Sequence, residues 1–207
     1  MNSWDSVRRP TRRVEKGPLV TGYLAALAIV LLLSTVITRV LLLRRAGTQA
    51  MHFGDLDKTD FLIPPVALFY FYTIFAAAFN WPLVSTQMFF YSNAIAWIGV
   101  GLCFIGLLVL FLSLVSFGRS FRVGIDVDQP DKLVTTGVFA ISRNPIYVGF
   151  ALVLVGQFLV FPNWIPLVYL AAGVSLFHRQ VLREESFMRQ HYGQEYADYC
   201  RRVRRYL

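Results

Sequence analysis

The stretch that decides the fold is AIAWIGVGLCFIGLLVLFLSLVSF, residues 94–117, which contains no charged side chain. About 20 consecutive apolar residues are enough for an α-helix to cross the hydrocarbon core of a bilayer. Two further apolar runs of comparable length occupy residues 19–43 and 61–84. Because a backbone inside lipid must satisfy its own hydrogen bonds, we expect each run to form a membrane-spanning helix.

The last apolar stretch, residues 146–177, is interrupted by Phe161-Pro162-Asn163-Trp164. Proline cannot donate a hydrogen bond within a helix, so this sequence predicts the tip of a hairpin between two short spans. Apolar side chains then recur at helical spacing over residues 178–207, with a bend expected at Gly193. The sequence therefore predicts an all-α integral membrane bundle of about five spans, followed by a C-terminal amphipathic helix.

Composition supports a membrane protein and argues against several soluble classes. Hydrophobic residues make up 56% of the chain and charged residues 15%, whereas soluble domains carry about a quarter charged residues. The net charge of +8 comes from Lys and Arg that flank the spans, where they would meet anionic lipid headgroups rather than nucleic acid. Cys103, Cys200 and the three His residues show no metal-ligand spacing, so no metal is expected.

The distribution of Lys and Arg predicts the orientation of the spans. With five spans, the first loop, the third loop and the C-terminal tail share one side and carry most of the basic residues, whereas the other side has the basic tail 1–18. Cytoplasmic loops are enriched in Lys and Arg, which places the C-terminus in the cytoplasm. We expect a multi-pass protein of a prokaryotic inner membrane, or of the endoplasmic reticulum in a eukaryote.

Polar residues gather in two segments, the third loop (117–147) and the C-terminal region (178–207). The adjacent acids Glu184 and Glu185 follow directly on the last apolar stretch, where a carboxylate is costly unless it has a cationic partner. Arg179 and Arg183 are close enough along a helix to provide that partner. A structural ion-pair network is therefore one interpretation of the acids, and a binding site for a cationic ligand is the other.

Three elements in this order resemble the isoprenylcysteine carboxyl methyltransferases and the related phospholipid methyltransferases. They are DKLVTTGVF (131–139) with SRNPIYVG (142–149), then REE (183–185), then YGQEYADY (192–199). The resemblance covers roughly residues 94–207. It divides the chain into a basic tail (1–18), two N-terminal spans with their loops (19–93) and a methyltransferase core (94–207).

The resemblance implies S-adenosylmethionine as the methyl donor. It would be held between the third loop, the start of the fourth span and the polar end of the fifth span. Glu184 and Tyr147 would be the catalytic residues. The implied cofactor-binding residues are Leu133, Val134, Gly137, Phe139, Asn144, Pro145, Tyr147, Glu184 and Glu185. Carboxylates and aromatic faces suit the sulfonium and ammonium groups of this donor.

The implied acceptor is a lipidic carboxylate of the prenylcysteine type, which would enter from the bilayer. Gln180 stands where the family has a basic residue that pairs with this carboxylate, and the neighbouring Arg179 is the candidate to replace it. Asn144 replaces a family His, and Asn-Pro-x-Tyr is closer to phosphatidylethanolamine N-methyltransferases, which also carry a Gly-x-Gly that residues 99–101 could match.

Three alternatives therefore stay open beside carboxyl methylation. The first is phospholipid N-methylation. The second is a nicotinamide-dependent sterol reductase, for which the sequence offers no large basic pocket. The third is a non-catalytic structural membrane protein.

Overall fold

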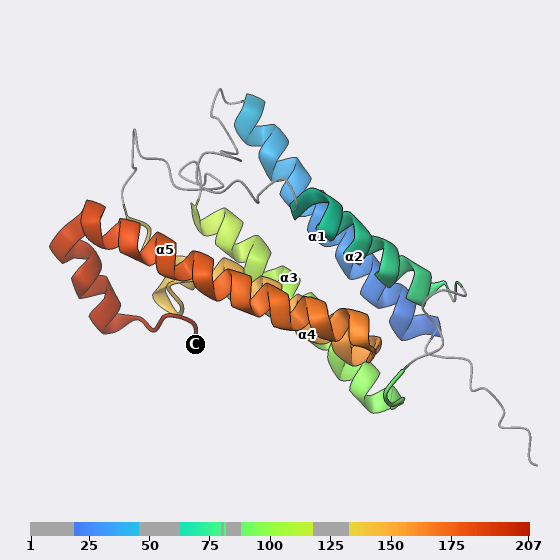
Figure 1. Ribbon diagram of the computed structural model, residues 1–207. Coiled ribbons are helices and arrows are strands. Elements are labelled where there is room, and N and C mark those ends of the chain that lie inside the picture. The colour runs from blue at the N-terminus through green and yellow to red at the C-terminus, as the bar shows by residue number, and fades with distance from the viewer. Residues whose placement is uncertain (1–18, 46–62, 80, 82–87, 118–132) are drawn as a thin grey trace, which may run out of the picture.

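The computed structural model describes residues 19–45, 63–79, 81, 88–117 and 133–207, and within them the chain is helical (Figure 1). The elements are α1 (Leu19–Arg45), α2 (Ile63–Ala78), α3 (Asn93–Phe117), the short 3₁₀ helix η3 (Gly137–Ala140), α4 (Pro145–Val160) and α5 (Trp164–Arg202). These five α-helices confirm the predicted all-α bundle, and their bounds follow the apolar runs of the sequence.

Three of the helices, α1, α3 and α5, are long and apolar enough to cross a membrane. The remaining two, α2 and α4, have 16 residues each. At 1.5 Å per residue such a helix reaches about 24 Å, which is shorter than the roughly 30 Å hydrocarbon core. The chain is an integral membrane protein, and α4 is the short arm of the hairpin that the Pro-Asn pair predicted.

Helices α3 and α4 pack closely because glycines face each other along their contact. A Cβ atom added to Gly99 would lie 2.7 Å from the carbonyl oxygen of Gly156, and one added to Gly106 would lie 2.6 Å from that of Gly149. Small residues allow such close backbone approach between membrane helices. Apart from the backbone of its own helix, no atom of the described residues lies within 4 Å of a Cβ added to Gly101. Gly99 therefore serves helix packing.

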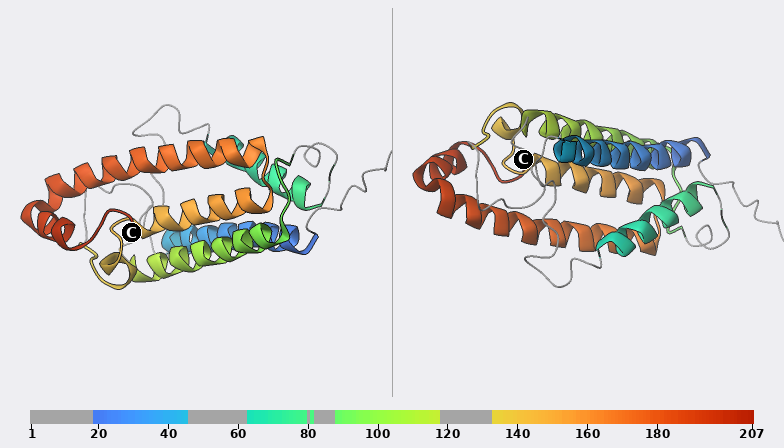
Figure 2. Two further views of the ribbon diagram at one scale, coloured as in Figure 1. Left: turned by 90° about the horizontal axis from the view of Figure 1, so that it is seen from below. Right: turned by 90° about the horizontal axis from the view of Figure 1, so that it is seen from above.

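Helix α4 lies between α5 and the pair formed by α1 and α3 (Figure 2). A polar contact fixes α1 to α4 within this arrangement, because the fully buried Gln157 donates from Nε2 to the carbonyl oxygen of Ala25 at 2.8 Å. The core around this contact is apolar and includes Ile29, Leu110 and Val160. The face of α4 that points into the bundle is therefore fixed by this hydrogen bond and by apolar packing.

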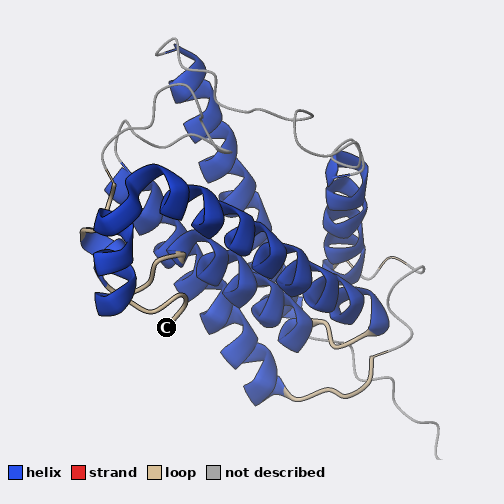
Figure 3. Ribbon diagram, turned by 60° about the vertical axis from the view of Figure 1, so that its left-hand side comes forward, coloured by secondary structure: helices blue, strands red, loops and turns tan. Residues whose placement is uncertain are grey.

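The C-terminal region differs from the expectation of a separate surface helix. Helix α5 runs without interruption from the span into the polar region, and the predicted bend occurs at Gly193, where φ is 50° (Figure 3). The helix ends at Arg202, and Val203 is extended. Beyond the helix, Arg204 pairs with Ser142 in a parallel β-bridge.

Candidate active site

The segment that precedes α4 is held in place by contacts with α3 and α5. Gly137 begins η3 with φ of 63°, and a Cβ atom there would lie 2.5 Å from the Oγ of Ser116 at the end of α3. Both features require glycine. Two residues further on, the carbonyl oxygen of the buried Phe139 accepts a hydrogen bond of 2.6 Å from the Tyr199 hydroxyl of α5.

Tyr147 and Glu184 meet where the first turn of α4 faces α5. Pro145 occupies the start of α4, a position that suits proline because no helical partner exists there for an N–H. Two residues later, still in the first turn, the hydroxyl of Tyr147 donates to Oε1 of Glu184 at 2.5 Å. The ring of Phe177 lies 5.8 Å from that of Tyr147. The expectation that the Asn-Pro-Ile-Tyr turn and the paired acids come together is confirmed.

The described partners of Glu184 are uncharged. Besides the Tyr147 hydroxyl, the side-chain amide of Gln180 donates to Oε1 of Glu184 at 3.1 Å. Gln180 precedes Glu184 by one helical turn, so both side chains lie on the same face of α5. No ion pair with Glu184 is found among the described residues. This carboxylate is thus fixed in place by neutral donors.

Glu185 has the opposite surroundings, although it is adjacent in sequence. Its side chain is buried and pairs with three guanidinium groups: Arg205 at 2.9 Å, Arg143 at 3.3 Å and Arg189 at 3.5 Å. Asn144 adds a hydrogen bond of 3.4 Å from Nδ2. The hydrogen bond with Glu185 raises the pKa of Arg205. Glu185 is therefore the centre of an ion-pair network at this end of the bundle.

Sequence reasoning foresaw a network of this kind but named other cations, Arg179 and Arg183. Among its actual members, Arg189 could have been found from its i,i+4 spacing to Glu185. Arg143 and Arg205 could not, since they are 42 and 20 positions away in sequence and approach only when the hairpin and the C-terminus fold together.

The remaining predicted residues differ in how deeply they are buried. Leu133 and Val134 are partly buried just before η3, and Arg179 is exposed on α5. Asn144 is buried, and its amide also donates to the carbonyl oxygen of Arg205 at 3.1 Å. No group of three or more potential metal ligands occurs among the described residues, and the structure thus offers no metal site there.

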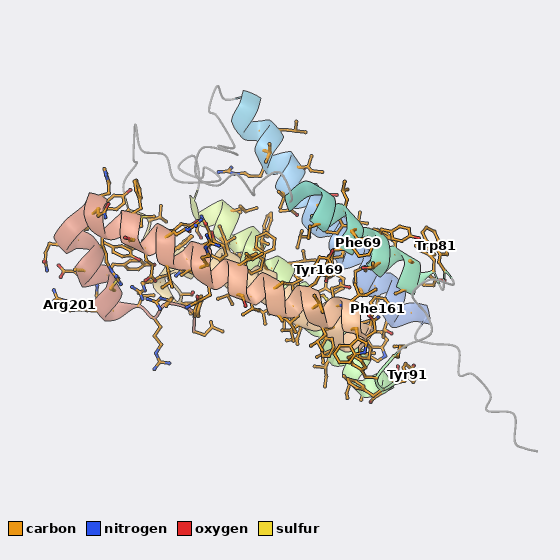
Figure 4. The ribbon with its side chains drawn as sticks, viewed as in Figure 1. Phe69, Trp81, Tyr91, Phe161, Tyr169 and Arg201 are labelled. Carbon is orange, nitrogen blue, oxygen red and sulfur yellow. The ribbon has the colours of Figure 1, made fainter. Side chains whose placement is uncertain are left out.

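Among the described residues, most charged side chains lie toward one end of the molecule. In Figure 4 many nitrogen-bearing side chains gather toward the end of α5 that carries Arg201, whereas Phe161 and Tyr91 lie at the opposite end. Before the bend at Gly193, residues 164–192 of α5 extend about 44 Å at 1.5 Å per residue, which is longer than the hydrocarbon core requires. The fold and the site define an integral membrane helical bundle with a partly buried carboxylate site at the open end of a helical hairpin.

Comparison with known proteins relates part of the chain to one family. The family model described as phospholipid methyltransferase matches residues 94–195. A probable protein-S-isoprenylcysteine O-methyltransferase of Oryza sativa subsp. indica is 33% identical over 114 residues, covering 53% of this chain and 59% of the relative. Residues 94–195, about half of the chain, are thus similar to this family of proteins.

Other relatives agree with this assignment. Protein-S-isoprenylcysteine O-methyltransferase B of Arabidopsis thaliana is 32% identical over 108 residues, covering 51% of this chain and 55% of its own length. The Tribolium castaneum protein-S-isoprenylcysteine O-methyltransferase is 31% identical over 141 residues, covering 64% of this chain and 50% of its own length. The chain spans half to three fifths of the length of these curated relatives.

A solved structure shares the fold. The eukaryotic intramembrane Ras methyltransferase ICMT superposes with a TM-score of 0.55 at 22% sequence identity, over 72% of this chain and 55% of the solved one. At this level of identity the similarity concerns the arrangement of the helices.

Proposed function

We propose that this protein is an S-adenosylmethionine-dependent methyltransferase of the membrane that esterifies the carboxylate of a prenylcysteine-type lipid. The names of its relatives support the reaction class. The observation that carries the proposal is the Tyr147–Glu184 contact, which combines a carboxylate, an aromatic ring and neutral donors at the meeting point of two helices. A carboxylate in such surroundings suits a cationic ligand.

The residues present fit this donor. S-adenosylmethionine carries a sulfonium and an ammonium group, and when bound it supplies an electrophilic methyl group. Glu184 would balance one of the positive charges, and the rings of Tyr147 and Phe177 would lie beside it. Leu133 and Val134 would contact the apolar part of the donor, while Gly137, Phe139, Asn144 and Pro145 set the course of the backbone there.

The protein would contribute mainly orientation. By donating to Oε1, Tyr147 holds the Glu184 carboxylate in one position, and Gln180 adds a second hydrogen bond to the same oxygen. An acceptor carboxylate is ionised at neutral pH, so the chain needs no general base to prepare it. Alignment of two bound reactants alone can lower a barrier by ~7–11 kcal/mol.

We place the acceptor on the bilayer side of the same site, with its lipid tail between helices. The amide of Gln180 already bonds Glu184, so Arg179 is the proposed partner of the acceptor carboxylate, on the adjoining face of α5. We also propose that the site faces the cytoplasm of a prokaryote, or the cytoplasmic side of the endoplasmic reticulum, because Lys and Arg are concentrated on this side of the spans.

One observation favours a second acceptor class, phosphatidylethanolamine. Gln180, at the position where the resemblance leads us to expect a basic residue, is neutral and bonds Glu184. An amine acceptor would have to lose a proton, and Glu184 is a carboxylate within the site that could accept it. The description of the family model, phospholipid methyltransferase, fits this reaction as well.

Transfer of labelled methyl groups distinguishes the two acceptors. The protein in lipid nanodiscs would be given S-adenosylmethionine labelled in its methyl group, together with either a farnesylcysteine analogue or phosphatidylethanolamine. We expect label in the farnesylcysteine product that mild base releases as methanol, because the bond formed is an ester. Base-stable label in the phospholipid would instead assign N-methylation. The matched control, Glu184→Gln, should transfer little label to either acceptor.

A further inference from the structure

The C-terminal tail, residues 203–207, folds back onto the segment that leads into α4. The main-chain amide of Arg143 donates to the carbonyl oxygen of Arg204 at 3.0 Å, within the parallel bridge between Ser142 and Arg204. Figure 1 shows the C-terminus beside α5 and close to the η3 segment. Tyr206 joins the tail to α5, because its hydroxyl lies 2.7 Å from Nδ1 of His178. The tail thus contacts α5 and the segment that leads into α4.

Within the tail, Arg205 makes the connection between the two helices. Its guanidinium group forms two hydrogen bonds with Glu185 of α5, at 3.1 and 2.9 Å. Its carbonyl oxygen accepts from Nδ2 of Asn144, the residue that precedes α4, at 3.1 Å. Asn144 in turn donates to Glu185. Arg205, Asn144 and Glu185 therefore close a triangle of contacts between the start of α4 and the middle of α5.

This triangle is adjacent to the proposed site without being part of it. Glu185 follows Glu184 directly, and Asn144 lies one helical turn before Tyr147. Successive helical residues point about 100° apart, so Glu185 faces away from the face that carries Glu184. The hydrogen bonds of Arg205 go to Glu185, and among the described residues none joins Arg205 to Tyr147 or Glu184.

We propose that Arg205 is a positioning residue, which sets the distance between Tyr147 and Glu184 by holding the first turn of α4 against α5. The inference rests on the proposed methyltransferase function. A bidentate guanidinium–carboxylate pair is suited to this role because it fixes geometry as well as charge. Removal of the Arg205 side chain leaves Glu185 paired with Arg143 and Arg189, so the carboxylate is not left without a cation.

The test compares Arg205→Gln, Arg205→Lys and the control Arg202→Gln, each as the full chain in lipid nanodiscs. Arg202 contributes the same charge three residues earlier, and its Nε donates to the carbonyl oxygen of Asp198 in the preceding turn of α5. We expect Arg205→Gln to lower kcat/KM for methyl transfer about tenfold or more, since a misplacement of about 1 Å can cost up to ~10²-fold. The midpoint of thermal unfolding should fall by less than about 5 °C.

The remaining variants test whether the geometry of the Arg205–Glu185 pair, rather than its charge alone, matters for activity. Arg205→Lys should recover only part of the activity, because lysine keeps the charge and loses the bidentate geometry. The control should stay within about twofold of the wild type. In the double variant Glu185→Gln/Arg205→Gln, the loss should be no greater than in Glu185→Gln alone, since both substitutions remove the same contact. Wild-type kcat/KM in Arg205→Gln would overturn the positioning role.

Hydrogen exchange separates this inference from the proposed function. In Arg205→Gln we expect faster exchange of the amides of residues 143–148, which the triangle and the tail hold in place, with or without S-adenosylmethionine. If the wild type transferred no methyl group but this exchange still increased, the proposed function would fail and the structural part of the inference would stand. If the wild type were active and the variant had the same activity and exchange, the inference alone would fail.

Discussion

The neighbouring acids Glu184 and Glu185 have the same side chain and opposite surroundings. Glu185 is held by three arginines from α5, from the segment before α4 and from the C-terminal tail. Glu184 is held by a tyrosine hydroxyl and a glutamine amide. A helix turns about 100° per residue, so adjacent side chains can serve different partners. We infer that Glu185 joins parts of the protein, whereas Glu184 is available to a positively charged ligand.

Substitution of Glu185 by glutamine should have the largest effect of the variants considered. The quantity that changes is the unfolding free energy. It removes the charge that is shared by Arg143, Arg189 and Arg205, of which Arg143 is nearly buried. Breaking a buried ion pair by removing one partner costs about 3 kcal/mol. Unfolding in detergent, followed by circular dichroism, would measure the loss. An unfolding free energy equal to that of the wild type would show that the network does not hold the fold together.

Substitution of Glu184 by glutamine should affect function and leave the fold intact. Glutamine keeps an oxygen that accepts from Tyr147, so we expect the unfolding free energy to change by less than about 1 kcal/mol. Loss of the charge should reduce methyl transfer by roughly tenfold to a hundredfold, the equivalent of a hydrogen bond to a charged group. The assay is labelled-methyl transfer at a fixed donor concentration. Destabilisation as large as that of Glu185→Gln would remove the distinction between the two acids.

The Tyr147 hydroxyl should contribute less than the Glu184 charge. Tyr147→Phe keeps the ring beside Phe177 and removes the hydrogen bond to Glu184. One such bond is worth about 1 kcal/mol, so we expect donor affinity to fall about fivefold. Titration calorimetry of the variant beside the wild type would measure this change. A loss as great as in Glu184→Gln would mean that the hydroxyl itself contacts the ligand.

The smallest effect on the unfolding free energy is expected for Arg189, the most exposed arginine of the Glu185 network. Arg189 is 60% exposed and lies 3.5 Å from Glu185 with i,i+4 spacing. Pairs of this type contribute about 0.3–0.5 kcal/mol. Arg189→Gln should therefore lower the unfolding free energy by no more than this amount and leave methyl transfer unchanged. A stability loss that approached that of Glu185→Gln would identify Arg189, rather than Arg143 and Arg205, as the principal partner.

The sequence predicted the parts of this molecule that depend on local patterns. Apolar runs located α1, α3 and α4, the Pro162-Asn163 pair located the hairpin tip, and Gly193 located the bend. The family motifs also led to the correct expectation that Tyr147 and Glu184 meet. Each of these signals lies within a short segment or in the order of segments.

What the sequence did not reveal depends on contacts between distant segments. Helical spacing over residues 178–207 suggested an amphipathic helix, but it gave no sign that Arg204, beyond α5, pairs with Ser142. For the same reason Arg143 and Arg205 were not recognised as partners of Glu185. The sequence analysis assigned both acids to the cofactor site. Only their three-dimensional surroundings distinguish Glu184, the proposed cofactor contact, from Glu185, the centre of the ion-pair network.

Titration of S-adenosylmethionine into the wild type and Glu184→Gln, both in lipid nanodiscs, tests the central claim most directly. We predict saturable binding to the wild type and an affinity at least about tenfold lower for the variant, because only the wild type offers a negative charge to the donor. Equal affinities, or no binding to the wild type at millimolar donor, would contradict the claim that Glu184 holds a cationic methyl donor.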